Sequence, residues 1–103
     1  MTTLAKHPKQ LLTIITEAAL EKRLTADAKR LNAQGYTVLD VRGGSANAIH
    51  EGLWDADRLI EMKIICDTAV ADAIAVFIME NYAANYAISM FFSEVAVIRN
   101  EKY

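Results

Sequence analysis

A strand–helix–strand pattern occurs twice along this chain of 103 residues, and this repeated order constrains the fold more than any other feature. The first copy extends from Lys9 to Arg42, and the second copy extends from Arg58 to Arg99. Right-handed crossovers place both helices of such a chain on one side of a four-stranded antiparallel sheet. The sequence therefore predicts an α+β fold with the βαββαβ order of the ferredoxin-like architecture.

The first copy begins with Lys9–Thr16, an apolar, β-branched segment without alternation that is typical of a central strand. A helix is predicted over Glu17–Gln34, with Thr16 capping its start and Gly35 ending it in the left-handed conformation. Four apolar residues at helical spacing predict its buried stripe: Leu20, Leu24, Ala28 and Leu31. The β-branched segment Tyr36–Arg42 is the next predicted strand.

The second copy begins with Arg58–Cys66, in which successive side chains alternate between two faces. One face carries Ile60, Met62, Ile64 and Cys66, and the other carries Leu59, Glu61, Lys63 and Ile65. A helix capped by Asp67 or Thr68 is predicted from Ala69 to about Tyr82. Its expected buried residues are Val70, Ile74, Phe77 and Ile78.

The last predicted strand, Tyr86–Arg99, follows a turn at Ala83–Asn85 and is apolar on both of its sides. Its two faces carry Ile88, Met90 and Phe92 on one side and Phe91, Val95 and Val97 on the other. The whole chain is 53% hydrophobic with a mean hydropathy of +0.14, yet no apolar run approaches the roughly 18 residues of a membrane span. Because helices cover only one face of the sheet, we expect further copies of the chain to cover the other face.

One domain is expected over residues 9–103, preceded by a flexible N-terminal tail at residues 1–8. The tail lacks the apolar segment of a secretion signal, so none is expected. The single cysteine, Cys66, excludes a disulfide framework and favours a cytoplasmic location. The net charge of −2 argues against nucleic-acid binding.

The segment Gly43–Asp57 is the longest interruption of the pattern, and loops of this length usually bind a ligand or partner. It begins with two glycines, whose backbone amides can face an anion without a side chain in between. Guanidinium groups and amides together suit phosphate or bicarbonate. The predicted anion site, with bicarbonate as a candidate ligand, comprises Arg42, Gly43, Gly44, Asn47 and Arg58. The alternative is a flexible hinge that binds nothing.

Three segments resemble the framework strands of PII signalling proteins: LLTIITE (Leu11–Glu17), GYTVLDV (Gly35–Val41) and SEVAVIR (Ser93–Arg99). The resemblance covers about Gln10 to Arg99 and is greatest to the PII-like branch associated with bicarbonate uptake and carboxysomes. It implies a homotrimer that binds ADP or AMP between subunits, with bicarbonate as a second ligand. It also implies a regulatory role without enzyme activity, in which the Gly43–Asp57 segment (the T-loop) contacts a carboxysome component or a bicarbonate transporter.

The same resemblance implies roles for individual residues. Ile14 would border the adenine, Thr37 would lie near the adenosine, and Gly43 with Gly44 would approach the phosphates. Asn47 would help to hold ligands at the loop base, and Arg99 would reach phosphates in the neighbouring subunit's cleft. The implied nucleotide-binding residues are Ile14, Thr37, Val38, Arg42, Gly43, Gly44, Lys63, Ala87, Ile88 and Arg99.

This chain also departs from the family pattern in ways that bear on its ligands. The loop has no tyrosine, so the uridylylation of enteric PII proteins is not available. Asn85–Ile88 replaces the usual Gly-x-Gly-Lys of the phosphate-binding loop, and Ala46 stands where an arginine or lysine is common. Both changes favour a mono- or diphosphate over ATP, and they argue against binding of 2-oxoglutarate with Mg-ATP.

Several of these residues have purely structural alternatives. Arg99 could be a solvated strand end, and Glu61 with Lys63 could form an ion pair instead of lining the cleft. Trp54 is expected to act as a lid or partner anchor, unless it packs on its own domain. His7, His50 and Cys66 do not predict a metal site.

No catalytic constellation is evident, and two other functions stay open. One is a ligand-independent trimeric scaffold of the divalent-cation-tolerance type, which shares the frame. The other is a small enzyme that acts on phosphoesters. Acylphosphatase shares the fold, but the segment Thr16–Ala19 lacks the arginine-bearing loop that acylphosphatase needs.

Overall fold

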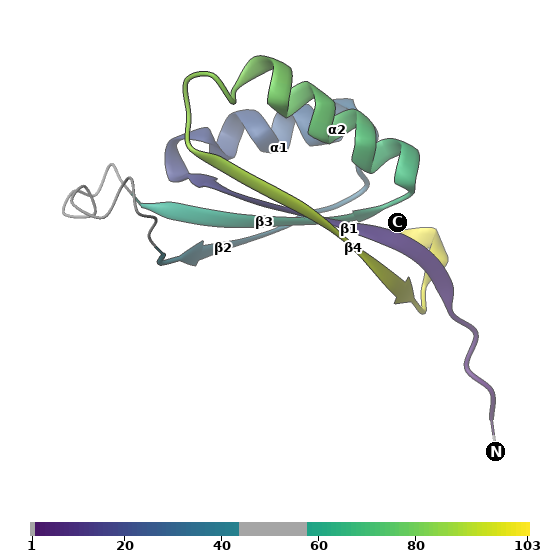
Figure 1. Cartoon of the computed structure of the whole chain (residues 1–103). Coiled ribbons are helices and arrows are strands. Elements are labelled where there is room, and N and C mark those ends of the chain that lie inside the picture. The colour runs from purple at the N-terminus through teal and green to yellow at the C-terminus, as the bar shows by residue number, and fades with distance from the viewer. Residues whose placement is uncertain (1, 44–57) are drawn as a thin grey trace.

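The computed structural model describes residues 2–43 and 58–103. Its strands are β1 (His7–Glu17), β2 (Thr37–Val41), β3 (Leu59–Cys66) and β4 (Ile88–Val97). Its helices are α1 (Glu21–Arg30), α2 (Thr68–Asn81) and the short 3₁₀ turns η1 (Ala18–Leu20) and η3 (Asn100–Lys102). Both α-helices lie on the same side of the sheet, which confirms the predicted α+β, βαββαβ fold (Figure 1).

The four strands form one antiparallel sheet in the order β2-β3-β1-β4. The register places Val38, Met62, Ile14 and Met90 side by side in one row across the sheet. The central strands are therefore β1 and β3, while β2 and β4 are the edge strands. The prediction that the first strand is central is confirmed.

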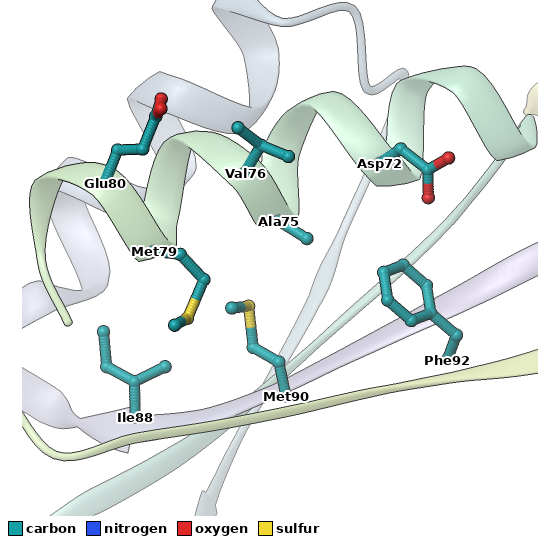
Figure 2. A pocket seen from close by; sticks show the side chains of 8 residues that line it. All are labelled: Asp72, Ala75, Val76, Met79, Glu80, Ile88, Met90 and Phe92. Atoms are coloured by element: carbon teal, nitrogen blue, oxygen red, sulfur yellow. The ribbon is translucent and has the colours of Figure 1, made fainter.

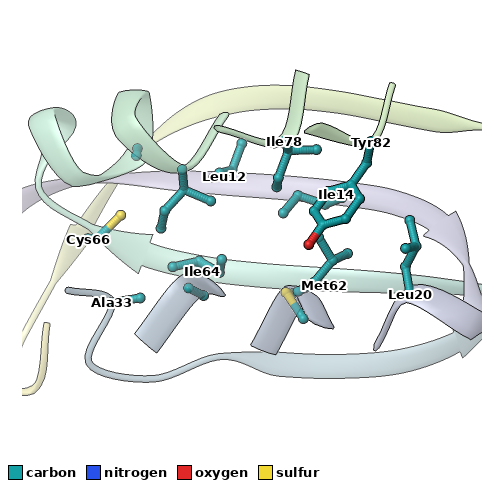
Figure 3. Close-up of a cluster of buried hydrophobic side chains, with 13 residues drawn as sticks. Leu12, Ile14, Leu20, Ala33, Met62, Ile64, Cys66, Ile78 and Tyr82 are labelled. Atoms are coloured by element: carbon teal, nitrogen blue, oxygen red, sulfur yellow. The ribbon is translucent and has the colours of Figure 1, made fainter. Parts of the chain in front are cut away.

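A single core fills the space between the sheet and the helices (Figure 3). Its fully buried members are Leu12, Ile14, Leu20, Leu24, Met62, Ile64, Ile74 and Ile78. The predicted alternation of β3 is confirmed, because every second residue from Ile60 to Cys66 is buried. The apolar stripe of the first helix is confirmed as well, with Leu31 partly buried at its end.

The prediction that Thr16 caps the first helix is wrong. Strand pairing continues through Thr16 and Glu17, because these residues lie opposite Ile60 and Leu59 of β3. The Thr16 hydroxyl donates instead to the Ala87 carbonyl at 2.8 Å. The helix therefore begins later than predicted, after the 3₁₀ turn η1.

The helix also ends earlier than predicted, and Asn32 rather than Gly35 takes the left-handed conformation, with φ 81°. The Ala33 amide donates to the Ala28 carbonyl at 2.9 Å, and the Asn32 amide donates to the Lys29 carbonyl at 3.1 Å. These two bonds form a Schellman motif, which asparagine can complete because it tolerates positive φ.

Smaller boundary differences have similar tertiary causes. The predicted tail is too long, because His7 and Pro8 already pair with β4. Asp67 precedes α2 as predicted, but its carboxylate pairs with Lys9 Nζ at 2.7 Å and makes no cap bond. The last strand is two residues shorter at each end than the predicted Tyr86–Arg99.

The face of the sheet opposite the helices is uncovered in a single chain (Figure 1). Large apolar side chains lie on it, among them Leu39, which is 41% exposed, and Phe91, which is 48% exposed. Exposed apolar surface of this kind is typical of a subunit interface. Within the described residues, no helix is long and apolar enough to cross a membrane.

Candidate functional site

Arg42, Gly43 and Arg58 of the predicted anion site lie at one end of the sheet, where all four strands begin or end. Val41 of β2, Leu59 of β3 and Glu17 of β1 share a row, and Ile88 of β4 lies opposite the neighbouring Thr16. Strand pairing therefore gathers the end of β1, the end of β2 and the starts of β3 and β4. We refer to this as the Gly43 end of the sheet.

Arg42, Gly43 and Arg58 extend directly beyond the paired strands at this end, and all three are exposed. The carbonyl of Arg58 accepts a hydrogen bond from the Ala18 amide at 2.8 Å, so η1 holds the backbone of Arg58 in place. Among the described residues, a Cβ added at Gly43 would meet nothing within 4 Å, so none of them fills the space beside its backbone. Two guanidinium groups beside open backbone suit a small anion.

The predicted contributions of Gly44 and Asn47 lie outside the described residues. The same holds for Ala46, His50 and Trp54. The described part of the predicted bicarbonate site is therefore Arg42, Gly43 and Arg58. Arg42 and Gly43 directly follow β2, and Arg58 directly precedes β3.

Ala87, a predicted nucleotide contact, also lies at the Gly43 end and is held by two side chains of β1. The Ala87 amide donates to Glu17 Oε2 at 2.9 Å, and the Ala87 carbonyl accepts from Thr16 Oγ1 at 2.8 Å. Sequence reasoning missed Glu17 as a site residue. In the sequence Glu17 is the first residue of a predicted helix, and its partner Ala87 lies 70 positions away along the chain.

A cluster of aromatic and charged side chains supports the turn before Ala87. Arg23 donates to the Tyr86 hydroxyl at 2.8 Å, and its guanidinium lies 5.8 Å and 5.5 Å from the ring centres of Tyr82 and Tyr86. The Tyr82 hydroxyl donates to Asp27 at 2.5 Å. This hydrogen bond, followed by burial, raises the pKa of Tyr82. The cluster ties α1 to the segment that leads into β4.

Thr37 and Lys63 face each other across β2 and β3, on the uncovered face of the sheet. Lys63 Nζ lies 3.4 Å from Glu61 Oε2, so the structural alternative of an ion pair is present. The Lys63 side chain is still 45% exposed and can also approach a ligand. Val38, next to Thr37, packs against the core from the covered face.

The predicted contact of Ile14 with adenine is wrong for a single chain. Ile14 is 0% exposed, because its row on the covered face lies beneath the helices. It is a core residue with no surface open to a ligand. Ile88 also packs against this core, but it remains partly exposed.

Arg99 lies at the opposite end of the sheet from Gly43. Strand β4 starts at Ile88 beside the Gly43 end and finishes at Val97, which is opposite His7. At about 3.3 Å per residue, β4 is roughly 30 Å long, and Arg99 lies beyond its far end. Its Nε lies 3.2 Å from Glu101 Oε1 on the surface. Arg99 can therefore join an anion site at a Gly43 end only if that end belongs to another copy.

The described residues contain no group of three or more histidine, cysteine, aspartate and glutamate side chains that could hold a metal ion. Cys66 is buried on the covered face, and burial raises the pKa of its thiol. Such a thiol is a weak nucleophile and a weak metal ligand. His7 lies in β1, while His50 is outside the described residues.

An open groove of about 610 Å³ lies between α2 and the outer edge of β4 (Figure 2). Its lining consists of Asp72, Ala75, Val76, Met79, Glu80, Ile88, Met90 and Phe92. The floor is apolar, and the charged side chains among these eight described residues are both acidic. Because these eight residues provide no cation, the groove does not suit a phosphate or bicarbonate. Ile88 is the one residue among the eight that was predicted to contact a ligand.

Comparison with known proteins gives a family and a set of related folds. The model of the family described as nitrogen regulatory protein P-II matches residues 9–102. A candidate PII-like signaling protein from Thermus thermophilus is 36% identical, with a TM-score of 0.84 over 97% of this chain and 99% of that chain. No curated protein matches the chain.

Two further solved structures share the fold at low identity. CPII from Thiomonas intermedia K12, bound to ADP and bicarbonate, is 21% identical, with a TM-score of 0.83 over 97% of this chain and 98% of that chain. CutA from Synechococcus elongatus PCC7942 is 9% identical, with a TM-score of 0.67 over 97% of this chain and 95% of that chain. The same fold is thus found in proteins that differ widely in sequence.

Proposed function

Because this chain belongs to the nitrogen regulatory protein P-II family, a family of regulatory proteins, we propose that it is a sensor of adenine nucleotide and bicarbonate. It binds ADP or AMP between the subunits of a homotrimer and bicarbonate near the base of the T-loop. In this way it signals energy and inorganic-carbon status. The observation that carries the proposal is the position of Arg42, Gly43 and Arg58 together at the Gly43 end.

Bicarbonate is a small planar anion, and its recognition needs short-range donors combined with positive charge. A guanidinium presents parallel N–H donors that match two oxygens of such an anion. Arg42 and Arg58 bring two of these groups to adjacent strands, and Gly43 leaves backbone open between them. The structure of CPII with ADP and bicarbonate supports the choice of ligands through a shared fold.

The nucleotide would use residues of two subunits. Ala87 and Gly43 lie at one end of the sheet, whereas Arg99 lies at the other, so a phosphate can meet all three only between copies. Thr37 and Lys63 face outward on the uncovered side, where a second copy would pack. Leu39 and Phe91 supply apolar surface for that contact.

The target of the signal would be a carboxysome component or a bicarbonate transporter, contacted through residues 43–57. Bound anions at Arg42 and Arg58 would act at both ends of that segment. Ligands that favour one conformation shift its population in proportion to their differential affinity. The proposed location is the cytoplasm, in association with carboxysomes.

Calorimetry with ADP, in the presence and absence of bicarbonate, tests the proposal. Bicarbonate should raise the affinity for ADP by about fivefold or more, as expected for coupled sites. Arg42→Ala should weaken bicarbonate binding by roughly tenfold, because it removes a charged hydrogen-bond donor. Lys29→Ala, which removes an exposed cation from α1, serves as the control and should change neither affinity.

Thermal unfolding and a turnover assay distinguish the two other functions. A trimer whose melting temperature rises with divalent metal but not with nucleotide would instead favour the scaffold of the divalent-cation-tolerance type. Turnover of a phosphoester that is lost in Arg42→Ala or Arg99→Ala would favour a small enzyme. Absence of any heat with ADP, combined with no effect of bicarbonate, would contradict the sensor.

A further inference from the structure

Glu17 makes an unusual contact for the last residue of a central strand. Its Oε2 accepts a hydrogen bond from the Ala87 amide at 2.9 Å. This bond joins the end of β1 to the segment that precedes β4. The neighbouring Thr16 donates its hydroxyl proton to the Ala87 carbonyl at 2.8 Å. Ala87 is therefore held by β1 on both its donor and its acceptor side.

The Glu17 contact occupies a donor that a phosphate could otherwise use. A backbone amide has one N–H, and a carboxylate is among its stronger acceptors. A phosphate oxygen that approaches Ala87 must displace Glu17 or accept a position beside its negative charge. Thr16 holds the Ala87 carbonyl, which belongs to the following peptide group, so both peptide groups at Ala87 are hydrogen-bonded to β1.

The charge of Glu17 also bears on its neighbours at the Gly43 end. Glu17 lies opposite Leu59 in the register, one residue after Arg58 on the adjacent strand. The carboxylate therefore lowers the positive potential that Arg58 and Arg42 create there. A ligand with many negative charges loses more from this than a ligand with few.

We infer that Glu17 is a specificity-determining residue that limits how many phosphates the bound nucleotide carries. This inference rests on the proposed nucleotide site and deepens it. Glu17 holds the Ala87 amide and opposes added negative charge, so AMP and ADP are accepted and ATP is disfavoured. The replacement of the usual phosphate-binding lysine removes an attraction, whereas Glu17 adds a repulsion.

Two substitutions separate the charge of Glu17 from its hydrogen bond. Glu17→Gln keeps an acceptor for the Ala87 amide and removes the charge, and Glu17→Ala removes both. We expect the affinity for ATP to rise about tenfold in Glu17→Gln and further in Glu17→Ala, while the affinity for AMP changes by less than about twofold. The gain for ATP should shrink as salt is raised, because screening weakens the repulsion that was removed.

The control is Glu94→Gln, which removes the same charge from an exposed position opposite Gln10, far from the Gly43 end. It should leave the ratio of ATP to ADP affinity unchanged. Calorimetry with AMP, ADP and ATP on the wild type and the three variants gives the result. Circular dichroism confirms that each variant is folded.

The outcomes separate this inference from the proposed function. If the wild type binds ADP and the ratio of ATP to ADP affinity is the same in Glu17→Gln and Glu17→Ala as in the wild type, only the role of Glu17 is overturned. If neither the wild type nor any variant binds an adenine nucleotide, the proposed function fails and the role of Glu17 fails with it. A ratio that changes equally in Glu94→Gln would also overturn the role of Glu17.

Discussion

The two faces of the sheet differ in what they require from the rest of the molecule. On the covered face, Met62 and Ile64 are fully buried beneath the two helices of the same chain. On the uncovered face, Leu39 and Phe91 remain about half exposed, and Thr37 and Lys63 point outward beside them. One chain therefore completes its own core but leaves Thr37 and Lys63, two of the candidate ligand residues, on a face that its helices do not cover.

The largest expected effect on stability comes from a substitution in the core beneath the helices, on the covered face. Ile74→Ala removes a fully buried side chain from α2 and should destabilise the protein by about 2–5 kcal/mol, because a cavity remains. Urea unfolding measures the change. Val76→Ala on the exposed side of the same helix is the control, and a cost above about 1 kcal/mol there would contradict the assignment of the two sides.

A charged substitution on the uncovered face should affect assembly more than the fold of each subunit. Phe91→Asp places a charge on the apolar surface and should raise the dissociation constant of the oligomer by about 100-fold, or roughly 2.7 kcal/mol. Sedimentation over a concentration series measures it. The matched variant Val76→Asp adds the same charge on the helix side. Equal dissociation in the two variants would show that this face is not the interface.

A polar contact between α1 and the residue that ends α2 gives a smaller effect on stability, with a defined pH dependence. Tyr82→Phe should cost about 1 kcal/mol near neutral pH, because Asp27 loses its hydrogen bond. The bond raises the pKa of Tyr82 in the folded protein above its ordinary value of 10.0. The stabilisation is therefore complete below pH 10 and is lost as the pH rises through the raised pKa.

Unfolding of the wild type and Tyr82→Phe at a series of pH values tests this. The difference in the free energy of unfolding should be constant from pH 7 to about pH 9 and should narrow at higher pH. Tyr86→Phe, which removes the hydroxyl that accepts from Arg23, provides the comparison. A difference that widens above pH 10 would contradict the assignment of the Tyr82 hydroxyl as the donor.

The smallest effect on stability is expected on the uncovered face, at the ion pair of Lys63 and Glu61. Because Lys63 is 45% exposed, Lys63→Ala should change the free energy of unfolding by less than about 1 kcal/mol. It should nevertheless weaken ADP binding by a few fold, measured by calorimetry, if Lys63 faces the ligand. Unchanged ADP affinity would leave Lys63 with a structural role alone.

Local patterns predicted much of the fold. The alternation of β3 and the helical stripe from Leu20 to Leu31 were enough to place the core, because burial on one face requires those spacings. The helix caps at Thr16 and Gly35 were predicted wrongly. Both positions satisfied local preferences, but pairing across β1 and a Schellman motif at Asn32 took precedence.

The candidate site was predicted less completely than the fold. Arg42, Gly43 and Arg58 could be placed together because they flank one loop between adjacent strands. The contact of Glu17 with Ala87 could not be foreseen, because no periodicity relates residues 70 positions apart. The role of Ile14 was misjudged for a related reason, since a central strand has two faces and its sequence did not show which face the helices cover.

The sequence by itself determined the order of strands and helices and which side chains enter the core, because hydrophobic periodicity acts locally along the chain. Only the tertiary structure decided which residues meet at the Gly43 end, and that Arg99 lies at the other end of the sheet. The physical reason is that register and crossover direction set those distances. Strand pairing brought Glu17 to Ala87, and the position of both helices on one side left the other face of the sheet uncovered.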